Sequence, residues 1–143
     1  MTDRRDLLLG AFAAASAPLT LHAAEQHSAP STQSPFACDR LALTPALRHR
    51  HFDQLGPFLR TKIIDARPRT DGYDFHFPND WTTFASLSEW VNGERLCCPF
   101  FDFDLRLARE HGEVRMGLSG RPGTAEFIRS DFAPWFASAG ARG

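Results

Sequence analysis

The sequence predicts one α+β domain, with a four-stranded antiparallel sheet covered by helices on one face and the element order α-β-β-α-β-β-α. Two pairs of segments with alternating apolar residues, each pair separated by a turn signal, indicate two β-hairpins. Three segments that begin with capping residues and continue with apolar residues at helical spacing indicate three helices. The length of 143 residues suits a single domain.

The first helix and the first hairpin follow from local signals. Thr44–Pro45 is typical of a helix start, and Gly56–Pro57 predicts that this helix kinks or ends there. Residues 62–67 read as a strand, and Asp71–Gly72 predicts a turn after it. Residues 73–77 then alternate aromatic and polar side chains, as expected for a returning strand that is buried on one face.

The second half repeats this plan. Asn79–Asp80 offers caps for a second helix, which Pro99 closes. Residues 101–107 and 114–118 alternate apolar and polar side chains and predict the second hairpin. Thr124 is expected to cap a final amphipathic helix that runs through Trp135. The polar positions of the strands predict that the other face of the sheet is hydrated.

The N-terminus predicts export. Arg4–Arg5 precedes an apolar stretch of about fifteen residues, too short for a membrane span of about 20 residues and typical of a twin-arginine signal peptide over residues 1–24. Residues 25–36, rich in Ser, Pro and Gln, predict a disordered tether, and residues 37–139 the folded domain. The expected route is the twin-arginine export machinery, and the location periplasmic or secreted. An uncleaved signal acting as a membrane anchor is the alternative.

Composition limits the classes of partner and reaction. The formal net charge is −1, from 16 basic and 17 acidic side chains, which argues against a nucleic acid or an anionic membrane surface as partner. No Ser-His-Asp order, phosphate-binding loop or dinucleotide motif is present, so the sequence leans against enzyme activity and leaves it open. His49, His51, His76 and His111 are interpreted as surface residues.

The cysteines carry the chemical signal. Cys97 and Cys98 are adjacent at the end of the second helix, and Glu94 lies three and four residues before them, within reach of either sulfur. Because Pro99 ends the helix, we expect it to bring the second thiol toward the first. Together with Cys38, these residues predict a site for a thiophilic ion, Cu(I), Zn(II), Hg(II) or As(III), with Glu94 in support.

Other states of the cysteines stay open at this point. In an oxidising compartment, Cys38 can form a disulfide with one member of the pair. The protein would then be an interaction module stabilised by this disulfide, which binds an unknown protein partner and no metal. A Cys97–Cys98 disulfide predicts a thiol redox protein, which Glu94 disfavours because a nearby carboxylate raises a thiol pKa. Inert core cysteines are the remaining alternative.

Several motifs resemble a family of small uncharacterised bacterial proteins that share an E-R-x-C-C-P-F signature. The resemblance spans residues 37–128 and rests on these segments: Ala37-Cys38 with Leu43-Thr44, Gly72–Pro78, Glu94–Phe100, and Leu118–Gly123 with Phe127-Ile128. It implies that Cys38, Glu94, Cys97 and Cys98 belong to one site, and it implies no particular activity. The export signal and Gly56–Pro57 depart from the family pattern.

Overall fold

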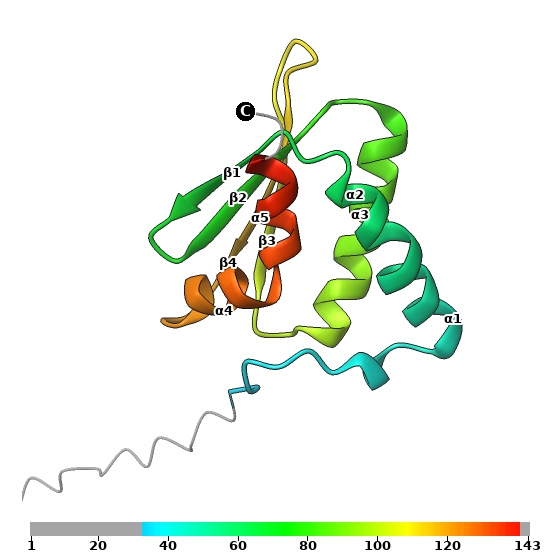
Figure 1. Ribbon diagram of the computed structural model, residues 1–143, viewed down its shortest axis with the longest axis vertical. Helices are drawn as coiled ribbons and strands as arrows, with labels where there is room; N and C mark the ends of the chain where they lie inside the picture. The colour runs from blue at the N-terminus through cyan, green and yellow to red at the C-terminus, as the bar shows by residue number, and fades with distance from the viewer. Residues whose placement is uncertain (1–32, 141–143) are drawn as a thin grey trace, which may run out of the picture. The chain divides into compact units, whose positions relative to one another are not determined.

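A computed structural model describes residues 33–140, so the predicted signal peptide and most of the predicted tether lie outside the described residues. The elements follow in this order: η1 (Arg40–Ala42), α1 (Pro45–Arg48), η2 (His49–Leu55), α2 (Gly56–Arg60), β1 (Asp65–Arg69), β2 (Gly72–Phe77), α3 (Trp81–Cys97), β3 (Asp102–Leu107), β4 (Val114–Ser119), α4 (Thr124–Asp131) and α5 (Ala133–Gly140). This arrangement confirms the α+β fold (Figure 1).

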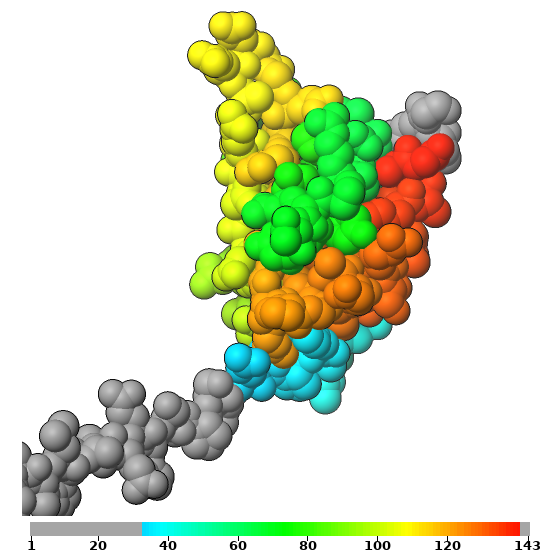
Figure 2. All heavy atoms as spheres, turned by 90° about the vertical axis from the view of Figure 1, so that its left-hand side faces the viewer, coloured from blue at the N-terminus to red at the C-terminus, as the bar shows by residue number. Residues whose placement is uncertain are grey.

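The sheet has the strand order β1-β2-β4-β3, and all neighbouring strands are antiparallel. The two predicted hairpins therefore meet along β2 and β4. The β3–β4 hairpin projects beyond the rest of the described domain, and Figure 2 shows it standing clear at one end. On the helix-free face, the guanidinium groups of Arg69 and Arg115 bind the carboxylates of Asp74 and Asp104. This face is thus polar, as the alternation predicted.

The other face of the sheet carries the aromatic core. Phe75, with no exposed surface, contacts Trp135 of α5 at 5.5 Å between ring centroids. Trp135 in turn lies 4.9 Å from the ring of Trp90 on α3. Burying a large aromatic side chain stabilises a fold by about 2–3 kcal/mol, and edge-to-face ring pairs add to that. The core consequently fixes α3 and α5 relative to the sheet.

The first helical region differs from the expectation. Thr44 caps it as predicted, its Oγ1 accepting from the Leu47 amide, but the chain does not leave the helix at Gly56–Pro57; instead the helix type changes there, from η2 to α2. A π-helical segment, η2, lies between α1 and α2, and the Gly56 amide donates to the carbonyl of His51. A proline lacks the amide that an α-helical turn requires. The wider π turn lets the chain remain helical through Pro57.

Two further boundaries differ. The first strand begins at Asp65 rather than at residue 62, because residues 61–62 form a turn that closes α2. The last helical region is divided at Phe132, and Gly123 rather than Thr124 is the N-cap of α4. Gly123 has φ +99°, a left-handed conformation that glycine adopts at no steric cost. The Thr124 hydroxyl instead donates to the carbonyl of Arg121.

The N-terminal arm, residues 33–39, packs on the domain. The ring of Phe36, placed in the predicted tether, contacts Phe100 at 5.3 Å and Phe127 at 6.0 Å. Across residues 33–140, no helix has the length and apolar character needed to cross a membrane.

Candidate metal centre

The C-terminal end of α3 and the N-terminal arm build one cluster. Asp80 starts α3 by accepting from the Thr83 amide, and Cys98 ends it with φ −123° and ψ 68°, outside helical values. The Asp39 amide donates to the Cys97 carbonyl at 2.7 Å, which holds the arm against this helix end. Pro99 therefore redirects the chain as predicted, and the arm reaches the cysteine pair.

Four predicted ligands lie together as a result. One ligand atom from each of Cys38, Glu94, Cys97 and Cys98 lies within 4.8 Å of the others, and this group could hold a metal ion. We call these four residues the cysteine cluster. Its Glu94, Cys97 and Cys98 are buried, whereas Cys38 is half-buried. The grouping that the motif resemblance implied is therefore present in the fold.

Two of the three cluster sulfurs are bonded to each other. Cys38 and Cys98 form a disulfide, and Cys97 is the free cysteine of the described residues. The Sγ atoms of Cys97 and Cys98 are 3.9 Å apart, so the third sulfur lies against the disulfide. Of the states left open by the sequence, the structure contains the one in which Cys38 is tied to the second member of the pair.

The surroundings of Cys97 disfavour its thiolate. Its Sγ lies 3.5 Å from the carbonyl oxygen of Glu94 and 3.7 Å from that residue's Oε2. Burial, and then the negative charge of Glu94, raise the pKa of Cys97 to about 12. A thiol in this environment stays protonated at neutral pH and is a poor nucleophile.

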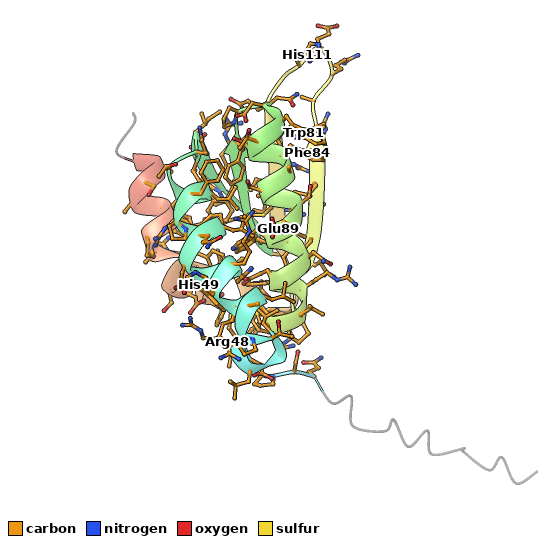
Figure 3. All side chains as sticks on the ribbon, turned by 90° about the vertical axis from the view of Figure 1, so that its right-hand side faces the viewer. Arg48, His49, Trp81, Phe84, Glu89 and His111 are labelled. Atoms are coloured by element: carbon orange, nitrogen blue, oxygen red, sulfur yellow. A yellow bond between two sulfur atoms is a disulfide. The ribbon has the colours of Figure 1, made fainter. Side chains whose placement is uncertain are left out.

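His51 is the site residue that the sequence interpretation missed. Its side chain is only 3% exposed, and its Nε2 shares a hydrogen bond of 2.7 Å with Glu94 Oε2. The surface interpretation was therefore wrong for His51. It was also wrong for His76, which is buried and bonded to Glu113 at 3.0 Å. It holds for His49, exposed and paired with Asp53, and Figure 3 shows His49 on the outer side of its helix.

The position of His51 depends on two residues of α3. Its ring stacks on Trp90, with centroids 5.3 Å apart and planes inclined by 12°. A Cβ added at Gly93 would lie 2.6 Å from His51 Nδ1, so only glycine leaves room for the imidazole. Within the described residues, His51 Nδ1 is buried without a hydrogen-bond partner. Glu94 thus has its own buried partner, and this partner is a histidine.

A surface ion pair fixes the same two segments from outside. Arg50 of η2 donates to both carboxylate oxygens of Glu89 on α3, at 2.9 and 2.8 Å. Figure 3 places Glu89 midway along α3, facing the helical region that carries His49. This pair lies on the solvent side of the helices, whereas the His51–Glu94 pair lies on the buried side.

A pocket of about 170 Å³ opens beside the cluster, and Cys38, His51 and Glu94 are among the residues that line it. Asp131 lies at the same pocket, with its Oδ2 3.9 Å from Cys38 Sγ. A disulfide sulfur carries no proton, so this is a contact and not a hydrogen bond. Burial raises the pKa of Asp131.

The cluster, its buried histidine and its pocket are the features on which a function can be argued. In comparisons with known proteins, no protein-family model, curated protein or solved structure matches this chain.

Proposed function

We propose that the reduced protein binds one thiophilic metal or metalloid ion through Cys38, Cys97 and Cys98, with Glu94 as a fourth ligand. The observation that supports this most is the separation of at most 4.8 Å among the four ligand atoms. Two sulfurs on one tetrahedral Zn(II) lie about 3.8 Å apart. The Cys97 and Cys98 sulfurs, at 3.9 Å, are already at that separation.

The proposal assigns the disulfide to an ion-free state. Oxidation removes Cys38 and Cys98 as thiolate ligands and leaves Cys97 alone. A dithiol reductant converts the disulfide into two thiols and is itself oxidised to its disulfide. Each thiol that then binds an ion releases its proton, as thiol ligands do.

The charge of the cluster also favours a cation. Glu94 is a buried carboxylate next to buried sulfurs, and further negative charge on those sulfurs is unfavourable without a counter-charge. A bound cation supplies that counter-charge. Sulfur ligands suit Cu(I), Zn(II), Hg(II) and As(III), and they exclude Mg(II) and Ca(II), which take oxygen ligands.

The test is native mass spectrometry of the full chain, with and without a phosphine reductant, after addition of Zn(II), Cu(I), Hg(II) or arsenite. We expect one ion per reduced chain, removable by acid, and none on the oxidised chain. The control is the Cys97→Ser/Cys98→Ser variant under the same reducing conditions. If the reduced wild-type chain binds none of these ions better than this variant, the proposal fails.

A stapled interaction module is the second candidate, and the Cys38–Cys98 disulfide favours it. Its binding surface would include Leu47 and Leu96, each half exposed and both lining one small surface hollow. This function suits the exported location that we propose from the N-terminal sequence, where disulfides persist. If this second function is correct, a variant with all three cysteines changed to serine should lose stability but still bind the protein partner. If the protein binds an ion instead, the same variant should no longer bind it.

A further inference from the structure

The pocket beside the cysteine cluster has aromatic walls. Phe52, Trp90, Phe132 and Trp135 line it, and three of these rings pack on one another. Trp90 lies 6.0 Å from Phe132 and 4.9 Å from Trp135, and Phe132 lies 5.4 Å from Trp135. These rings give the pocket one apolar side, while Arg60, Glu94 and Asp131 also line it.

The volume of the pocket matches one small ring. It is about 170 Å³, and an apolar protein cavity of about 150 Å³ is large enough to bind benzene. A bare metal ion coordinated by the cluster would leave this space to water. A ligand that carries a phenyl-sized substituent would fill it.

The pocket and the cluster share residues. Cys38 and Glu94 belong to the cysteine cluster and also line the pocket. An atom bound to the sulfur of Cys38 therefore lies beside the aromatic walls. The ligand that fits both places has a soft atom for the sulfurs and an apolar ring for the pocket.

Building on the proposed function, we infer that the site takes a monosubstituted organoarsenic(III) compound, with its aryl group in the pocket and its arsenic bound by Cys38 and Cys98. Arsenic(III) with one carbon substituent has two bonds left for ligands. Cys38 and Cys98 supply two sulfurs that already reach bonding distance of each other when oxidised. After a dithiol reductant has opened the disulfide, R–As(OH)₂ and two thiols give R–As(S–Cys)₂ and two waters. Arsenic keeps its oxidation state.

Gly56 provides the variant that tests the pocket without touching the cluster. It lines the pocket, and a Cβ added there would lie 3.4 Å from the His51 carbonyl oxygen and 3.9 Å from Trp90 Nε1, both tolerable contacts. Gly56→Leu should therefore fill the pocket, and Gly56→Ala should fill part of it. Gly140→Leu is the matched control, because nothing lies within 4 Å of that Cβ.

The experiment titrates the reduced full chain with phenylarsine oxide and with methylarsonous acid, each affinity being expressed relative to dithiothreitol as competitor. Both compounds offer arsenic to two thiols and differ in the organic group. We expect the chain to prefer the phenyl compound at least ten-fold, and Gly140→Leu to keep that preference. Gly56→Leu should lose it and bind the methyl compound as the wild type does; Gly56→Ala should lose part of it.

Equal relative affinities for the two compounds, or a preference that survives in Gly56→Leu, would overturn this inference. If the methyl compound still binds in either case, the cysteine cluster remains an ion site. If neither compound binds the wild type better than the Cys38→Ser/Cys98→Ser variant, this inference fails, and the titrations with Zn(II), Cu(I), Hg(II) and arsenite decide the proposed function separately. Urea unfolding followed by tryptophan fluorescence shows whether Gly56→Leu is folded, and Gly56→Ala replaces it if it is not.

Discussion

Reduction of the Cys38–Cys98 disulfide should lower the free energy of unfolding by about 4 kcal/mol. The two cysteines are 60 residues apart, and the loop-closure entropy of an unfolded chain cross-linked over that distance corresponds to about 4 kcal/mol at 25 °C. With a urea dependence of about 2 kcal/mol per molar, typical of a domain of this size, the midpoint of unfolding should fall by about 2 M.

The assay is urea unfolding at pH 7, followed by tryptophan fluorescence, with and without a phosphine reductant. Trp90 and Trp135 are buried in the core and report its loss. Cys97→Ser is the control, because it keeps the disulfide and should show the same drop on reduction. A midpoint that moves by less than about 0.5 M would refute the reasoning. So would three alkylatable thiols, rather than one, in the unreduced and unfolded chain.

Three further predictions concern the residues around the cluster. Glu94→Gln should weaken Zn(II) binding to the reduced chain at least ten-fold, measured by competition with a chelator, whereas Glu89→Gln on the same helix should leave it unchanged; equal effects would contradict a ligand role. Gly93→Ala should destabilise the fold by about 1–3 kcal/mol in urea unfolding, because the new methyl group displaces His51; an unchanged midpoint would contradict the packing described. The folded pKa of Cys97, about 12, exceeds its ordinary value of 9.0, so its contribution to stability is complete below pH 9 and is lost as the pH rises from 9 to 12. The difference in stability between the oxidised wild type and Cys97→Ser should fall over that range by up to about 1.4 kcal/mol per pH unit, and a flat difference would contradict the raised pKa.

The parts of the fold that could be predicted are those with a strong local period. Strands β2, β3 and β4 alternate apolar and polar side chains, and Asp80 marks the start of α3 with a cap that the structure contains. The closeness of Glu94, Cys97 and Cys98 also follows from helical spacing and from Pro99. These features depend on a few neighbouring residues, which a sequence displays directly.

His51 could not be predicted in the same way. It lies 43 residues before Glu94 in the chain, and nothing near it in the sequence signals the pairing. The π-helical segment η2 contains it, and a π turn shifts the side chains that follow away from their α-helical positions.

The reach of Cys38 was the remaining open question. Its position depends on the path of the arm, which the Asp39 amide and the Phe36 ring fix against α3 and α4. Such contacts join residues that are distant in the sequence, and they produce no periodic pattern of apolar residues from which they could be predicted. The sequence therefore limited Cys38 to a few partners, and the fold selected Cys98.

The covalent loop from Cys38 to Cys98 also determines how the molecule responds to force. When the chain is pulled from its two ends, the residues between the two cysteines cannot extend while the bond is intact. About 200 Å of contour length stays out of reach. That loop contains the β1–β2 hairpin and all of α3. A motor that threads the chain from one end would meet a closed ring at the cluster, and reduction at that one point would release it.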